Sequence, residues 1–172
     1  MNELDEIWAQ KLAEAAENAR VSGRHDVADY LALKAANDTI RRAAVGWLFD
    51  TAVQIAAEAN RKFSGIAIER EDPYNFSIRG ANLVGSMLRV RHGVRCMTIE
   101  AGWTRTPADG FMRGGALAIA RIVHFGMPKA NIDLSLVKRE DAPVWITVAE
   151  ELRSTEFNST GLLQHFKIFH QV

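Results

Sequence analysis

Two kinds of hydrophobic periodicity divide the chain near residue 63. Before that point, apolar residues recur at every third or fourth position, which is the spacing of one face of an α-helix. After it, apolar and polar residues alternate, as in β-strands with one buried face. Ten of the 12 glycines also lie in this second part. The pattern predicts a single domain with a helical part, residues 1–62, and a sheet-rich part, residues 64–172.

Three helices are expected in the first part. The first follows Asn2, a suitable N-cap, and ends before Gly23. The second is expected over residues 26–36. The third is expected to be capped by Asp38 or Thr39 and to end at Arg61 and Lys62, whose positive charges stabilise the negative end of the helix dipole.

Seven strands are expected in the second part: residues 65–70, 76–79, 87–91, 94–100, 116–125, 132–138 and 144–148. The links between them are short, and parallel strands would need crossover helices, so the sheet should be mainly antiparallel. The expected class is α+β, with three N-terminal helices packed on one face or edge of a curved, mainly antiparallel sheet of about seven strands.

The last stretch, residues 149–172, fits two structures equally well. The spacing of Leu162, Leu163, Phe166 and Phe169 suits a helix. Alternation at Phe166, Ile168 and Val172 suits a strand. The periodicity leaves both open.

Composition favours a compact protein in a reducing compartment. The 172 residues are 48% apolar, and glycine and proline together number only 16, which disfavours a disordered chain. No apolar run approaches the ~20 residues that cross a bilayer, and Glu3 and Asp5 stand where a secretory signal would carry positive charge. Cys96 has no partner for a disulfide. We expect a cytoplasmic protein that does not enter a membrane.

Charge is unevenly distributed along a chain whose net charge is zero. Residues 1–60 hold six basic and ten acidic side chains. Residues 79–129 hold eight basic side chains, seven of them arginine, against two acidic ones. Arginine binds phosphate and carboxylate through two parallel hydrogen bonds, so this bias favours recognition of an anion.

The first candidate anion site is the expected hairpin around His92 and Gly93. Arg89 and Arg91 lie two residues apart and share a strand face, and Arg95 is expected nearby across the turn. Cys96 is expected on the opposite, buried face, where its thiol would be inert. Three close guanidinium groups need compensation, either from water or the acidic N-terminal helices, or from a bound polyanion.

The second candidate is the long loop over residues 102–115. Its glycines allow backbone N–H groups to approach an anion, two arginines supply charge, and an aromatic ring can stack on a ligand. The candidate residues are Trp103, Arg105, Gly110, Arg113, Gly114 and Gly115. The alternative is an ordinary turn at Asp109 and Gly110, with Trp103 and Phe111 in the core.

Other chemistry has little support in the sequence. Phosphate-binding, dinucleotide-binding, nucleophile-elbow and zinc-protease motifs are absent, and no histidine pair has the spacing of metal ligands. We expect no metal and no cofactor. His124 is expected on the solvent face beside Arg89, or in a hydrogen bond at a strand end.

Three functional hypotheses remain. The first is a non-enzymatic binding protein whose arginines engage an acidic protein surface or nucleic acid; the neutral total charge disfavours general coating of DNA. The second is a small-molecule-binding protein or enzyme with a pocket between helices and sheet. There Arg105 or Arg113 would orient a carboxylate or phosphate, and His124 or Asp133 would be the acid or base. The third is a homodimer formed through the first or third helix.

Overall fold

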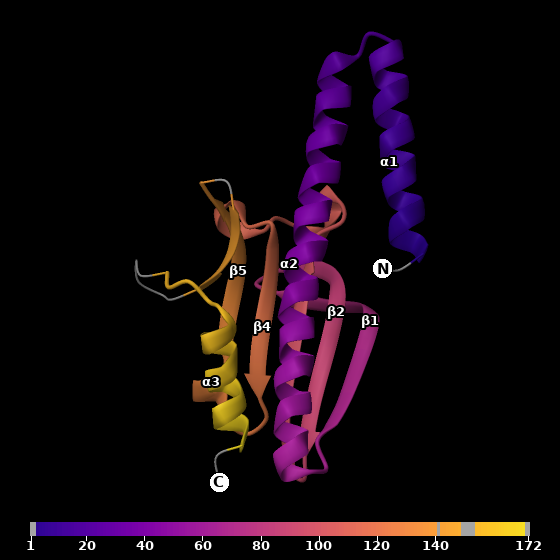
Figure 1. The fold of residues 1–172 in the computed structure, drawn as a ribbon. Helices are drawn as coiled ribbons and strands as arrows, with labels where there is room; N and C mark the ends of the chain where they lie inside the picture. The colour runs from indigo at the N-terminus through magenta and orange to yellow at the C-terminus, as the bar shows by residue number, and fades with distance from the viewer. Residues whose placement is uncertain (1–2, 141, 149–153, 171–172) are drawn as a thin grey trace. The chain divides into compact units, whose positions relative to one another are not determined.

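The computed structural model describes residues 3–140, 142–148 and 154–170, which form an α+β fold with an antiparallel sheet (Figure 1). Its helices and strands are α1 (Glu3–Val21), α2 (His25–Phe63), β1 (Ala67–Ile78), β2 (Ala81–His92), β3 (Arg95–Trp103), β4 (Ala118–His124), β5 (Ile132–Arg139), β6 (Ala142–Thr147) and α3 (Ser159–His170). Within these residues, no helix combines the length and the apolar character that a membrane crossing requires.

The chain divides into two compact units, one ending at Ala43 and the other beginning at Ala44. The first unit is a hairpin of α1 and the first part of α2, joined at Gly23, whose φ of 73° is in the left-handed region. Leu12, Ala19 and Ala28 are buried in this unit. The second unit contains the rest of α2, the whole sheet and α3.

The prediction of three N-terminal helices is wrong, because α2 is continuous through residues 37 and 38. The Asp38 carboxylate accepts a hydrogen bond from Arg41, one helical turn further on, at 2.7 Å. An aspartate at this position can cap the start of a new helix. In this chain Asp38 forms an i,i+3 ion pair with Arg41 inside one longer helix. The third helix of the described residues, α3, lies near the C-terminus.

The sheet has six strands in the order β1-β2-β3-β4-β5-β6, and every neighbouring pair is antiparallel. The prediction of seven strands is wrong, because the first two expected strands are the single strand β1. Its pairing with β2 shifts register between Glu71 and Tyr74. Pro73 lies in this bulge on an edge strand, where a residue without an N–H group is tolerated.

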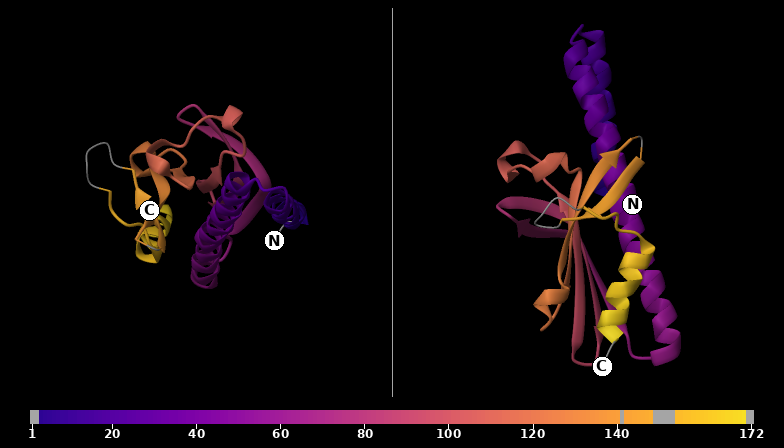
Figure 2. Two further views of the ribbon diagram at one scale, coloured as in Figure 1. Left: turned by 90° about the horizontal axis from the view of Figure 1, so that it is seen from above. Right: turned by 90° about the vertical axis from the view of Figure 1, so that its left-hand side faces the viewer.

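One face of the sheet, here called the helix face, is apolar and covered by helices. Leu88, Ile99 and Ile122 lie opposite one another on β2, β3 and β4 and are completely buried. The second part of α2 and α3 lie over this face (Figure 2). The indole Nε1 of Trp145 on β6 donates a hydrogen bond to the carbonyl oxygen of Ala44 on α2 at 3.2 Å.

The residues of the ambiguous C-terminal stretch that the structure describes end in a helix, α3. Asn158 is its N-cap: the Oδ1 atom accepts hydrogen bonds from the backbone N–H groups of Thr160 and Gly161 at 3.0 and 3.2 Å. Gly161 lies so close to the ring of Phe157 that a Cβ atom there would be 2.9 Å from it. Residues 149–153, 171 and 172 lie outside the described part of the chain.

The opposite face of the sheet, here called the outer face, carries a second small core at one end. Ile78, Ala81 and Leu83 are buried there, with Met112 of the long loop packed against them. The expectation that Phe111 is tucked into the core is wrong, because its side chain is 86% exposed. Met112, its neighbour, covers the strands instead.

Two glycines allow β2 and β3 to approach closely, which gives a test of the sheet. Gly85 and Gly102 are paired; a Cβ on Gly85 would overlap the backbone of Ala101, and one on Gly102 would lie 2.8 Å from Val84 O. We expect Gly85→Ala to lower the free energy of unfolding by about 1–3 kcal/mol, because rigid backbone must move. Urea denaturation followed by circular dichroism measures this change.

The control is Gly46→Ala, in the interior of α2, where a Cβ would meet no atom within 4 Å. This variant should be stabilised by up to about 1 kcal/mol, because alanine is the better helix former. Equal urea midpoints for Gly85→Ala and the natural chain would contradict the close approach of β2 and β3.

Candidate functional site

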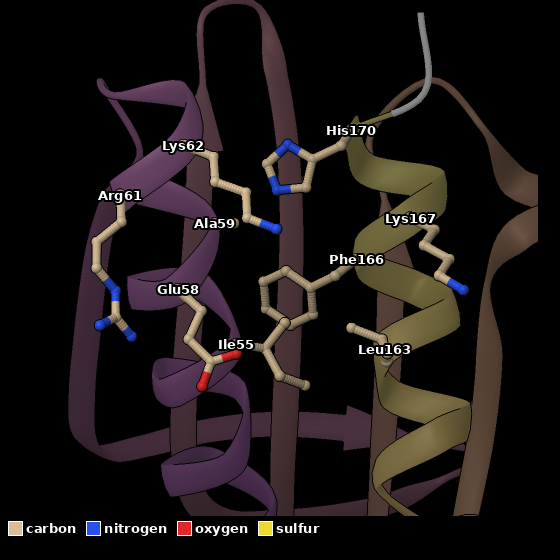
Figure 3. A pocket seen from close by; sticks show the side chains of 9 residues that line it. All are labelled: Ile55, Glu58, Ala59, Arg61, Lys62, Leu163, Phe166, Lys167 and His170. Carbon is tan, nitrogen blue, oxygen red and sulfur yellow. The ribbon is translucent and has the colours of Figure 1, made fainter.

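A groove of about 720 Å³ lies between the second part of α2 and α3 (Figure 3). The two helices run in the same direction over the helix face, and each contributes side chains from its last turns. The residues that line the groove are Ile55, Glu58, Ala59, Arg61, Lys62, Leu163, Phe166, Lys167 and His170. The volume is within the range of about 300–1,000 Å³ that is usual for small-molecule sites.

The middle of the groove is apolar. Ile55 from α2 and Phe166 from α3 face one another there, and Ala59 and Leu163 extend the same surface. Phe166 is almost completely buried, whereas the Leu163 side chain is 42% exposed. An exposed leucine beside a buried phenylalanine gives an apolar ligand a surface that is already formed.

One end of the groove is cationic. Lys62 and His170 point toward one another across this end, while Arg61 and Lys167 stand at the outer sides of the two helices (Figure 3). Among the described lining residues, Glu58 is the one that is acidic. Three permanent cations and one carboxylate leave this end positively charged.

His170 contributes a neutral imidazole to this end at pH 7. Burial lowers its pKa below the ordinary value of 6.5, and the nearby charges of His92 and Arg95 lower it further. Arg95 also holds the end of α3 in place, because its guanidinium donates hydrogen bonds to Phe169 O at 3.0 Å and Ile168 O at 3.5 Å. These carbonyl groups have no partner within the helix.

A buried histidine pair fixes the middle of α3 to the sheet. His124 Nε2 on β4 and His165 Nδ1 on α3 are 2.9 Å apart, and both side chains are buried. Burial lowers the pKa of His124. Burial, followed by the charge of His124, lowers the pKa of His165 to about 4. At pH 7 both rings are neutral, so one donates and the other accepts the hydrogen bond.

Neither acid–base candidate lines the groove. His124 was expected either on the solvent face or in a hydrogen bond at a strand end. The register places it on the helix face with Met97, and it forms a hydrogen bond with His165 at the end of β4, in agreement with the second alternative. Asp133 lies on the outer face, where it accepts hydrogen bonds from Arg79 Nη2 at 3.2 Å and Arg121 Nε at 3.0 Å. Sequence alternation alone does not state which face is covered.

The expected cluster of hairpin arginines is divided between the two faces. Arg89 and Arg91 lie on the outer face, and Arg89 forms an ion pair with Glu69 at 3.1 Å. Arg95 is paired with His92, so its guanidinium reaches α3 on the helix face. A two-residue turn aligns odd-numbered residues of β2 with even-numbered residues of β3, which separates Arg91 from Arg95.

The expectation for Cys96 is also wrong. It is paired with Arg91 and therefore shares the outer face with the two arginines. Its side chain is half-buried and not enclosed in the core. A second hollow, of about 510 Å³, lies here and is lined by Arg89, Arg91, Gly93, Val94, Arg95, Cys96, Thr98, Val123 and Phe125.

The long loop is ordered by its own contacts. Arg105 stacks over the ring of Trp103, which is buried, with 4.3 Å from guanidinium carbon to ring centroid. Gly110, Gly114 and Gly115 all have positive φ angles, so they serve the turns of the loop. Asp109 accepts hydrogen bonds from the backbone N–H and hydroxyl of Thr106 at 2.8 and 2.9 Å, which lower its pKa.

Arg113 begins the short 3₁₀ helix Arg113–Gly115 in this loop. Arg105 does not line the groove between α2 and α3.

The groove residues were not identified from the sequence. Arg61 and Lys62 were noted only as cations at the end of a helix, and Lys167 was not singled out. The available signal was their shared position in the last turns of two amphipathic helices. It could not be used without the helical structure of residues 159–170.

No protein-family model, curated protein or solved structure matches this chain. Within residues 3–140, 142–148 and 154–170, no three histidine, cysteine, aspartate or glutamate side chains gather to hold a metal ion. The support for a candidate site therefore comes from the geometry of the groove alone.

The buried histidine pair predicts a pH dependence of stability. Unfolded histidine titrates near pH ~6.5, whereas His165 in the folded chain has a pKa of about 4. Between these values the unfolded chain binds more protons, so the free energy of unfolding should fall as the pH falls from 7 to 5. Urea denaturation at several pH values measures the slope.

The slope should be smaller in His165→Gln, because glutamine retains hydrogen-bonding groups but does not titrate. His25→Gln, at an exposed histidine at the start of α2, is the control and should keep the natural slope. An equal slope in His165→Gln and the natural chain would show that the pair is not responsible.

Proposed function

We propose that this protein binds an amphiphile with a long apolar tail and a single anionic head group in the groove between α2 and α3. A long-chain carboxylate is the simplest such ligand. The observation that carries the proposal is the position of Lys62, which points into one end of a groove whose middle is apolar. The tail would lie along Ile55 and Phe166.

The shape of the site supports a flexible tail better than a compact polar molecule. The groove runs between two helices, and the side chains that line its middle are apolar. Burying a methylene group contributes about 0.8 kcal/mol. A tail of several methylenes therefore gains more than one polar contact would supply, and the polar groups at the end determine its direction.

The charges at the end of the groove support an anionic head group. Lys62 is exposed, and Arg61 and Lys167 add positive charge on both sides. These cations also stabilise the C-terminal ends of α2 and α3. That role does not require Lys62 to point across the groove toward His170, nor Leu163 to remain exposed.

Titration with cis-parinaric acid, whose fluorescence rises in an apolar site, tests the proposal. We expect saturable binding that oleate displaces and that oleamide, with a neutral head group, and hexanoate, with a short tail, displace more weakly. Lys62→Met keeps the apolar stem and removes the charge, so it should weaken binding about fivefold, equivalent to about 1 kcal/mol. Leu163→Asp should weaken it further, by placing a carboxylate beside the tail.

The matched control is Lys138→Met, which removes an exposed lysine on β5 outside the groove and should leave the affinity unchanged. Equal affinities for Lys62→Met and Lys138→Met, or the absence of saturable binding, would contradict the proposal. Circular dichroism confirms that each variant is folded before its affinity is compared.

A further inference from the structure

The hollow on the outer face has exposed apolar side chains at its rim. Val94, in the turn between β2 and β3, is 94% exposed, and Phe125, after β4, is 78% exposed. The two segments are adjacent, because Phe125 N donates a hydrogen bond to Cys96 O at 2.9 Å. Together they form an apolar edge, and both residues line the hollow.

Arg91 supplies a charge that no described residue neutralises by an ion pair. Arg89 and Arg121, on the same face, are bound to Glu69 and Asp133. Among the described residues, Arg91 forms no ion pair of this kind, and its side chain is exposed. A guanidinium group in this position can bind a carboxylate through two hydrogen bonds.

We infer that this hollow docks an acidic segment of a partner protein, with a carboxylate on Arg91 and an apolar side chain between Val94 and Phe125. Arginine and aromatic residues are enriched at protein–protein interfaces. The face does not suit nucleic acid, because Glu69, Glu71 and Glu100 lie on it beside the arginines. A nucleic-acid backbone would meet these carboxylates as well as Arg91.

The docking surface is separate from the groove. The groove lies on the helix face, and Arg91, Val94 and Phe125 lie on the outer face of the same sheet or at its end. Within the described part of the chain, the groove and the hollow share no lining residue. The two proposals can therefore be tested in one protein with different variants.

Fluorescence anisotropy with labelled octapeptides tests the surface on the full chain. The probe alternates glutamate and leucine; one comparison peptide has glutamine for glutamate, and another has serine for leucine. We expect weak, saturable binding of the first peptide only. Arg91→Gln and Phe125→Ser should each weaken it about tenfold. A twelve-residue single strand of thymidine nucleotides, labelled in the same way, should bind more weakly than the acidic peptide.

Two matched controls locate the binding. Arg24→Gln changes an exposed arginine of the first unit, and Phe111→Ser changes an exposed phenylalanine of the long loop. Both should bind the acidic peptide as the natural chain does. Lys62→Met should also bind it normally, which separates this surface from the groove.

Three results would overturn the inference: equal binding of the glutamine peptide, tighter binding of the thymidine strand, or equal losses in the control and test variants. Absence of binding to the acidic peptide would overturn it too. None of these results affects the binding of cis-parinaric acid. Failure of the peptide-docking surface and failure of the amphiphile groove can therefore be told apart.

Discussion

The architecture of the second unit depends on the alternation of side chains in an antiparallel sheet. Opposed residues in neighbouring strands point to the same side, so Leu88, Ile99 and Ile122 form an apolar row across three strands. Such a row must be removed from water. The chain covers it with two helices, one before the sheet in sequence and one after it, and the groove lies between these two helices.

The position of α3 determines the shape of that groove, and polar contacts hold the helix at three points. Asn158 caps its first turn, His165 is hydrogen-bonded to His124, and Arg95 binds the carbonyl groups of its last turn. The histidine pair satisfies ring nitrogens that would otherwise be costly to bury. Together with the buried side chains of Leu162 and Phe166, the three contacts fix which residues of α3 face α2.

The outer face differs from the helix face because it is charged. Carboxylates on its own strands neutralise most of its arginines. Glu69 binds Arg89, and Asp133 binds both Arg79 and Arg121. The excess of arginine over residues 79–129 is therefore not a continuous electropositive surface. What distinguishes one end of this face is Arg91, which lies beside two exposed apolar side chains.

The sequence by itself determined the division into helical and sheet-rich parts, the antiparallel pairing and the approximate positions of β3 to β6, because periodicity and short links are local properties. It located only the second half of β2, since residues 81–86 were not expected in a strand. It did not determine whether Asp38 interrupts a helix or whether the residues around Pro73 form a turn, since each depends on a partner elsewhere in the chain. Only the tertiary structure decided which face of the sheet is covered. That choice placed Arg95 and His124 under α3 and left Arg91 exposed. It also created the groove, because residues 55–62 and 163–170 become neighbours only when both helices cover the same apolar row.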